Sequence, residues 1–295
     1  AIENSGLEFS FGKDIKGIGG TRNCDWFFSN SAILLDTAGR YMTEDEDKEE
    51  WGAFLDTLKK YRKRKPINGV IVGISIADIM AASAEDIEAH AKNVRRRIDE
   101  LIQRLGLRFP VYVVFTKCDL IQGFVEFFEN LSRREREQIW GVTLPAAPRA
   151  GARPGAVFEE EFQALVRSLD DVRLKRLGSG TKPEIRSRVF TFPLQFAAIK
   201  GNVGLFIERL FQQNMYREAP IFRGFYFTSG TQEGVPMDLV IQAIARQFGL
   251  VAAAEAEPEI QKKSYFIKRL FTDVIIPDQH MGTRTLHASV HRGLA

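Results

Sequence analysis

The sequence is poor in the features that mark secreted, membrane-spanning or nucleic-acid-binding proteins. Its two cysteines, Cys24 and Cys118, are too few for a disulfide framework, which favours a reducing compartment. No uninterrupted apolar run approaches the ~18 residues of a membrane-spanning helix, and no signal-peptide pattern opens the chain. The 41 Lys and Arg nearly balance the 38 Asp and Glu, so a nucleic-acid partner is not expected.

A phosphate-binding loop of the form G-x-x-x-x-G-K-[ST] is also absent from the 295 residues. Such a loop cradles phosphates with its backbone N–H groups and would be expected before the other nucleotide motifs described below. The chain instead begins AIENSGLEF, without a Met. We therefore expect the phosphate-binding segment to lie upstream of Ala1 or to be missing.

Short apolar segments alternate with amphipathic ones along the chain. The clearest helix is predicted over 84–105, with Ser83 and Asp86 forming a capping box and Gly106 ending it. Further helices are expected at 51–58, 203–215 and 237–248. Strands are expected at 26–28, 32–36, 69–75, 111–116, 188–196 and 222–228. This alternation predicts an α/β fold with a mostly parallel sheet flanked by helices.

The segment AILLDTAGRY, residues 32–41, places an acidic residue directly after an apolar strand. Asp36 in that position can hold Mg²⁺, and Gly39 lets a backbone N–H approach a phosphate oxygen. With Thr37 between them, this is the D-x-x-G pattern of nucleotide switches; the alternative is a strand that ends in an ordinary turn. Arg40 stands where a water-positioning Gln is usual, so hydrolysis is not expected and no catalytic residue is assigned.

A second buried strand ends in Thr116-Lys117-Cys118-Asp119. This [N/T]-K-x-D pattern is typical of loops that bind a guanine base. The Asp119 carboxylate would accept two hydrogen bonds from the base, the Lys117 stem would cover the ring, and Thr116 would brace the loop. A helix-start turn capped by Asp119 is the alternative. The order of the two motifs, with a strand and a helix between them, is that of a GTPase.

Two further segments are weaker signals. Ala197 and Ala198, in FPLQFAAIKGNVGL, stand where a Ser-Ala pair usually supports the base, although a plain strand–helix turn is an equal alternative. Thr21, in GGTRNCDWFFS, would supply a hydroxyl to Mg²⁺ beside Asp36. The alternative for Thr21 is a glycine-rich turn that leads into a strand.

Several long segments resemble the IcmF/TssM family of type VI secretion and the related IcmF proteins of type IVB secretion. They extend from Glu3 to Ile275 and read ENSGLEF, GTRNCDWFF, LLDTAGRY, WGAFLDTLKKYRKRKPINGVIV, VFTKCDL, RGFYFTSGTQEG and KSYFIKRLFTDVI. The resemblance implies a P-loop-GTPase-like, mostly parallel sheet with a C-terminal helical extension. It implies GTP/GDP or ATP with Mg as ligands, although some family members lack the P-loop.

The resemblance also implies a domain plan and a cellular setting. Residues 1–217 are predicted to form the GTPase-like α/β domain, and 218–295 a strand and helical extension leading towards the membrane. The chain would be a soluble cytosolic part of a bacterial inner-membrane protein. That protein would assemble the membrane complex with TssL and TssJ, self-associate and dock baseplate subunits.

Two functions stay open on this evidence. The first is a scaffold whose assembly is regulated by nucleotide; the second is an NTPase that hydrolyses GTP or ATP to energise secretion. A third, a free cytosolic regulatory GTPase, is disfavoured by the absent P-loop and the long tail.

Charge runs raise one separate question. An acidic run at 44–50 is followed by KKYRKRK at 59–65. These are either solvated helix faces or, for the basic run, a surface for anionic lipid headgroups or an acidic partner.

Overall fold

The computed structural model describes residues 5–8, 25–37, 48–147, 152–178, 182–213, 218–230, 237–239 and 263–285. The strands are β1 (Asp25–Phe28), β2 (Ile33–Asp36), β3 (Val70–Ser75), β4 (Leu107–Arg108), β5 (Pro110–Thr116), β6 (Gly141–Thr143), β7 (Ile221–Phe227) and β8 (Thr283–Arg284). The α-helices are α2 (Lys48–Tyr61), α3 (Ile76–Ala81), α4 (Ala84–Leu105), α5 (Phe124–Phe128), α6 (Arg133–Arg136), α7 (Pro154–Gly178), α8 (Pro183–Ala198) and α9 (Lys200–Phe211). Shorter helical segments are the 3₁₀ turns η2 (Cys118–Leu120) and η4 (Pro277–His280) and the π-helix η3 (Leu270–Ile275).

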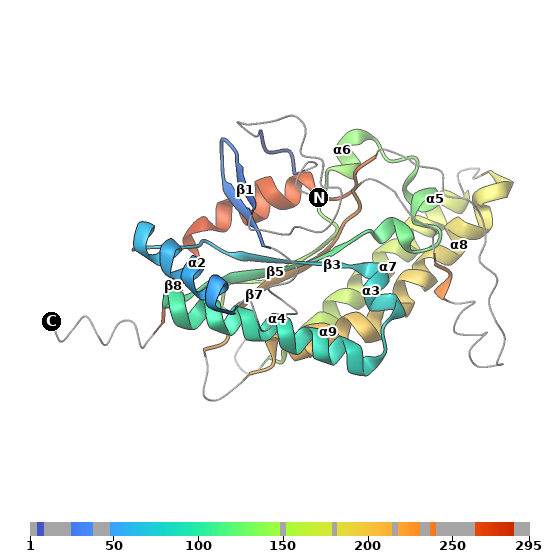
Figure 1. The fold of residues 1–295 in the computed structure, drawn as a ribbon. Helices are drawn as coiled ribbons and strands as arrows, with labels where there is room; N and C mark the ends of the chain where they lie inside the picture. Colours follow the sequence, from blue (N-terminus) through green and yellow to red (C-terminus); the bar gives the residue numbers. More distant parts are fainter. Residues whose placement is uncertain are drawn as a thin grey trace.

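A four-stranded sheet in the order β3–β5–β7–β6 forms the centre of the molecule (Figure 1). Strands β3, β5 and β7 are parallel, and β6 pairs antiparallel with β7. Strand β5 is buried at every position except its last, Thr116, which is half-buried. Burial of that extent requires cover on both faces of the sheet, which explains its unbroken apolar sequence PVYVVFT. The predicted mostly parallel sheet flanked by helices is confirmed.

The two faces of the sheet are covered by different parts of the chain. Val111 and Val113 of β5 pack into a large core formed with helices that include α4, α7, α8 and α9. Tyr112 and Val114, which point the other way, pack into a smaller cluster with η3 near the C-terminus. Figure 1 shows α4 and α9 on one side of the strands and the C-terminal helical segment on the other. This alternation is the period of two expected of a strand buried on both faces.

Helix α4 confirms the prediction for 84–105 at both ends. The Ser83 hydroxyl accepts from the Asp86 N–H at 3.1 Å, and the Asp86 carboxylate accepts from the Ser83 N–H at 3.3 Å. The helix ends at Gly106, whose φ of +65° lies in the left-handed region that favours glycine.

The strand predicted at 188–196 is wrong, because these residues lie inside helix α8. Val189, Phe192 and Phe196 are buried, at spacings of three and four, in the large core. Aromatic and β-branched residues favour strands locally, but here tertiary packing against one helical face decides the conformation.

Helices α8 and α9 form a run, Pro183–Phe211, that passes the test of length and apolar composition for a membrane-spanning helix. Many of its apolar side chains are nevertheless buried within the large core of the α/β body, among them Phe192, Phe196, Val203 and Phe206. A buried helix of a globular protein passes the same test of length and composition.

Strands β1 and β2 form a separate antiparallel hairpin, in which Asp25 is paired with Asp36. The hairpin packs on α2 through Trp26 and Phe54, whose ring centroids are 6.3 Å apart. Leu34 packs on the other side against a cluster that includes Phe271. Within the described residues, β2 therefore contacts the rest of the molecule through side chains and has no ladder to the four-stranded sheet.

The predicted division at residue 217 falls just before a strand of the central sheet. Strand β7 lies between β5 and β6, so the predicted domain and its predicted extension share one sheet. Further along, Tyr265 pairs with Ser229 in an antiparallel bridge, and Phe266 has a φ of +62°. Helical structure in this segment begins only at Lys268. The helix predicted at 237–248 lies outside the described residues except at 237–239.

Candidate functional site

The carboxyl ends of β3, β5 and β7 meet at one edge of the sheet. Ser75 ends β3 opposite Thr116 of β5, and Phe115 of β5 is paired with Phe227 of β7. Because these strands are parallel, their carboxyl ends share an edge, where ligands of α/β proteins commonly bind. We refer to Ser75, 116–119 and 228–230 as the carboxyl-edge site.

The loop at 116–119 is held tightly by its neighbours. The Thr116 hydroxyl donates to the Ile74 carbonyl at 3.2 Å, and the Cys118 N–H donates to the Thr228 carbonyl at 3.1 Å. Lys117 has a φ of +57°, the left-handed conformation, and starts the turn η2. This non-glycine residue in a sparsely populated conformation is characteristic of a functional loop.

Cys118 lies inside this loop but is fully buried. Burial raises the pKa of the Cys118 thiol well above its usual value, so the nucleophilic thiolate is disfavoured.

Asp119, the predicted base-binding carboxylate, faces into the protein. Only 5% of the residue is exposed, and its Oδ1 accepts a hydrogen bond from the Ser229 hydroxyl at 2.6 Å. Burial raises the pKa of Asp119, and the hydrogen bond from Ser229 partly opposes that rise. A base that used this carboxylate would have to share it with Ser229 or displace the Ser229 hydroxyl.

Ser229 also connects the site to the C-terminal part of the chain. Its N–H donates to the Tyr265 carbonyl at 3.1 Å, and its carbonyl accepts from the Tyr265 N–H at 2.8 Å. One residue therefore contacts Asp119 through its side chain and the segment 263–285 through its backbone.

Ser229 is the functional-site candidate that sequence reasoning missed. The signal is in the segment FYFTSG, where a buried strand is followed directly by Thr, Ser and Gly. Strands β3 and β5 likewise end in a polar residue, Ser75 and Thr116. The predicted supports of the base, Ala197 and Ala198, instead lie at the end of α8, where Ala197 is half-buried against the core and Ala198 is exposed. Ser229, which follows β7, lies beside Asp119, which follows β5.

The end of α8 does support the chain just beyond this loop. The buried Gln195 side chain donates to Gln122 Oε1 at 3.3 Å and to Asp238 Oδ1 at 2.6 Å, and it accepts from the Leu239 N–H at 2.8 Å. Gln195 therefore fixes both 237–239 and the chain three residues after Asp119.

The predicted phosphate and Mg²⁺ residues are only partly described. Asp36 and Thr37 lie at the end of β2 in the hairpin, while Thr21 and Gly39 lie outside the described residues. Among the described residues, no group of three or more His, Cys, Asp or Glu is placed to hold a metal ion. Thr116, Lys117 and Asp119 lie at the carboxyl edge, and binding of a base, of phosphate and of Mg²⁺ all stay predictions.

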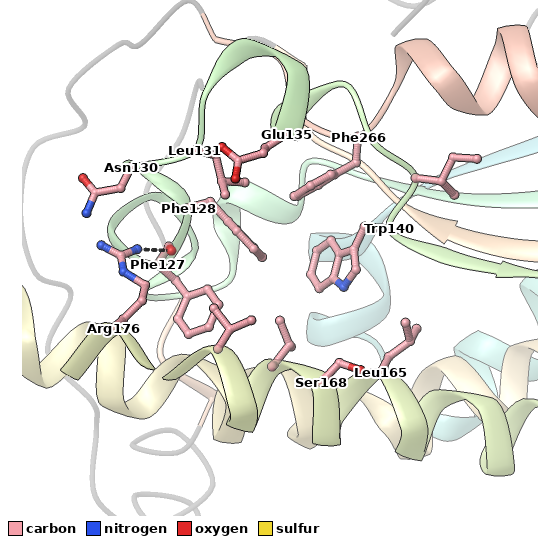
Figure 2. Close-up of a pocket in the computed structure, with 13 residues that line it drawn as sticks. Phe127, Phe128, Asn130, Leu131, Glu135, Trp140, Leu165, Ser168, Arg176 and Phe266 are labelled. Carbon is pink, nitrogen blue, oxygen red and sulfur yellow. Dashed lines mark hydrogen bonds between the residues drawn. The ribbon is translucent and has the colours of Figure 1, made fainter. Parts of the chain in front are cut away.

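An apolar cavity of about 490 Å³ lies between α5, α6 and α7 (Figure 2). Phe127, Phe128, Trp140 and Phe266 supply much of its wall. Its polar side chains serve the fold: the Arg176 guanidinium donates to the carbonyls of Glu126, at 2.9 Å, and Phe127, and the Glu135 carboxylate accepts from the Ser132 N–H at 2.7 Å. Such walls suit an apolar group and are unsuited to a nucleotide.

Comparison with known proteins gives two matches. Residues 44–295 match the model of the IcmF-related N-terminal domain. The chain is 46% identical over 284 residues to the type VI secretion system component TssM1 of Pseudomonas aeruginosa. That alignment covers 93% of this chain but 26% of the relative, so the chain spans about a quarter of the relative's length. No solved structure gives a significant match. These similarities extend over most of the sequence, and the chain therefore belongs to the IcmF/TssM family of type VI secretion proteins.

Proposed function

We propose that this chain is the cytosolic domain of an inner-membrane scaffold protein of a type VI secretion system. In this role it assembles the membrane complex with TssL and TssJ, self-associates within the full-length protein and docks baseplate subunits. The observation that carries the proposal is the 46% identity to TssM1 over 93% of the chain.

Nucleotide regulation of this scaffold is the second part of the proposal. It is supported by the carboxyl-edge site, where Thr116, Lys117 and Asp119 follow a buried parallel strand. The Asp119 carboxylate accepts a hydrogen bond from the Ser229 hydroxyl, and the backbones of Ser229 and Tyr265 form two hydrogen bonds. A guanine base that took hydrogen bonds to the Asp119 carboxylate would compete with Ser229. Its binding would then bias the position of the segment 263–285 and the partner contacts made there.

One observation favours a scaffold over the rival function, an NTPase that hydrolyses GTP or ATP. Arg40 stands where a water-positioning Gln is usual. The rival is favoured by the paired motifs DTAG and TKCD. In both functions, Asp36 with Thr21 would hold Mg²⁺, and Thr37 and Gly39 would face phosphate.

Two experiments on the full-length protein test the scaffold function and its regulation by nucleotide independently. Partner capture is measured by co-purification of TssL and baseplate subunits, and nucleotide binding by titration with fluorescent GDP, GTP and ATP in the presence of Mg²⁺. We expect Asp119→Asn to abolish guanine-nucleotide binding and to leave capture of TssL intact. If Asp119→Asn changes neither nucleotide binding nor TssL capture, Asp119 has no part in the proposed regulation. If TssL is absent from the purified complex, the scaffold function is contradicted.

The NTPase function is tested by phosphate release with Asp36→Ala as the matched variant. A scaffold predicts the same background rate in the parent and variant proteins. A rate well above background that falls in Asp36→Ala would establish the rival function.

A further inference from the structure

A strongly basic surface lies away from the carboxyl-edge site. Six of the seven residues at 59–65, KKYRKRK, are Lys or Arg, and we call this stretch the basic segment. It starts in the last turn of α2 and continues into the loop before β3. Residues 59–64 are exposed, and Tyr61 is 78% exposed. Since the whole chain carries a net charge of only +3, this is a marked local concentration of positive charge.

Among the described residues, the basic segment makes its hydrogen bonds to uncharged groups. Lys59 donates to the Arg104 carbonyl at 2.6 Å, Arg62 to the Asn68 side-chain oxygen at 3.5 Å, and Lys65 to the Gln279 carbonyl at 2.8 Å. All three acceptors are neutral oxygens. In the part of the chain that the structure describes, none of the six cations forms an ion pair with a carboxylate.

The arginine clusters of α4 and α6 include ion pairs with nearby carboxylates. In α4, Arg95 and Arg97 are buried and form ion pairs at 2.8 Å and 2.9 Å with carboxylates of the same helix. In α6, Arg133 pairs with Glu137 at 3.1 Å, and acidic residues alternate with the arginines. Unlike the α4 cluster, the basic segment is exposed, and unlike both clusters it forms no ion pair with a carboxylate among the described residues.

The shape of the segment also suits an anion. Residues 60–65 line a shallow open hollow whose walls come from this stretch alone, so every lining side chain is a cation or the Tyr61 ring. Lys60 lies over that ring, 5.8 Å from its centroid. A tyrosine has an apolar body and a polar tip, which suits the boundary between headgroups and water.

We propose that the basic segment binds anionic lipid headgroups at a bilayer surface. Clusters of four to eight Lys and Arg are the usual signature of such binding, at roughly fivefold in affinity per charge near the surface. A single-stranded nucleic acid is bound by several aromatic rings along a basic groove, and a protein partner by an apolar centre with a polar rim. The basic segment has one aromatic residue and no apolar centre, so lipid fits it better than either.

The location of the segment gives this binding an orientation. The basic segment directly precedes β3, and Lys65 and Asn68 both donate to the carbonyl of Gln279 in η4. It therefore lies at the amino ends of the parallel strands, at the end of the molecule where Figure 1 shows α2 and β8. The carboxyl-edge site lies at the opposite end of the same strands. A bilayer bound here would leave that site facing away from the membrane.

The test is co-sedimentation of the chain with vesicles of phosphatidylcholine containing about 30 mol% phosphatidylglycerol, beside pure phosphatidylcholine. The variant is Arg62→Gln with Lys63→Gln and Arg64→Gln, which removes three exposed charges. The control is Arg133→Gln with Arg134→Gln in α6. We expect binding to the anionic vesicles that weakens about 100-fold in the triple variant, weakens steeply with salt and changes little in the control. Circular dichroism verifies that each variant is folded.

Several results would overturn the proposal. These are equal binding to both kinds of vesicle, an unchanged affinity in the triple variant, or equal weakening in the α6 control. Competition by inorganic phosphate at the concentration of lipid phosphate would instead assign the hollow to a free anion. The assay uses neither nucleotide nor TssL, so a negative result would leave the proposed scaffold function standing.

Discussion

The hydrogen bond between Ser229 and Asp119 makes a prediction about stability as a function of pH. The Ser229 hydroxyl donates to Asp119 Oδ1 at 2.6 Å, and both residues are buried. A hydrogen bond to a charged group contributes about 1.5–3 kcal/mol. We expect Ser229→Ala to lower the free energy of unfolding by about 2 kcal/mol when the Asp119 carboxylate is charged.

The sign of the pH dependence follows from the pKa of Asp119. Burial raises this pKa above the ordinary value of 3.8, and the bond from Ser229 holds it down. Removing the hydroxyl raises the pKa of Asp119 further in the folded variant. A carboxyl group whose folded pKa exceeds its unfolded pKa destabilises the folded state when ionised, and that destabilisation is lost as pH falls through the folded pKa. The stability difference between parent and variant should therefore narrow on acidification, towards about 1 kcal/mol for a neutral hydrogen bond.

The assay is urea unfolding, followed by circular dichroism, at a series of pH values from neutral to mildly acidic. Thr228→Val is the matched control, since the Thr228 hydroxyl is equally buried and donates to the neutral Phe115 carbonyl at 3.3 Å. Its cost should be about 1 kcal/mol and independent of pH. A second check is the Asp119→Asn background, in which Ser229→Ala should cost less and lose its pH dependence. A cost for Ser229→Ala that is the same at every pH would refute the reasoning.

Three further predictions concern stability and use urea unfolding. Asp278→Asn should lower the free energy of unfolding by about 3 kcal/mol, because the largely buried Asp278 carboxylate accepts from Arg223 Nε at 2.7 Å. A double-mutant cycle with Arg223→Met should show a coupling energy above about 1 kcal/mol. Additive effects of the two substitutions would contradict this prediction. Phe192→Ala should cost about 3–5 kcal/mol, since its fully buried ring lies in the aromatic core; a loss under about 1 kcal/mol would mean that the site collapses without a cavity. Gly106→Ala should cost about 1 kcal/mol through its φ of +65°, and Gly106→Asn less, whereas equal costs would remove the left-handed cap as the cause.

Ser229, which follows β7, contacts both the loop at 116–119 and the C-terminal segment. The Asp119 carboxylate accepts a hydrogen bond from the Ser229 hydroxyl within the fold. The same serine pairs with Tyr265, which leads into the segment that packs on the far face of the sheet. In the proposed function, the ligand site and the segment 263–285 therefore both contact Ser229.

Local patterns in the sequence were sufficient for several elements. Helix α4 was predicted at both ends, because Ser83, Asp86 and Gly106 act through hydrogen bonds and backbone angles within a few residues. Strand β5 was predicted because an unbroken apolar run with β-branched residues suits a strand covered on both faces. The position of Thr116, Lys117 and Asp119 at the end of that strand followed directly.

Tertiary structure decided the rest. The run at 188–196 has the composition of a strand, yet it is helical because Phe192 and Phe196 reach the aromatic core only from one face of α8. That Ser229, and not Ala197, lies beside Asp119 depends on β7 pairing with β5 across more than 100 residues of chain, which no local pattern records. The sequence by itself determined that β3, β5 and β7 are strands and that β5 ends in a polar loop. Only the tertiary structure decided which other loops meet it, because strand order arises from packing between distant segments.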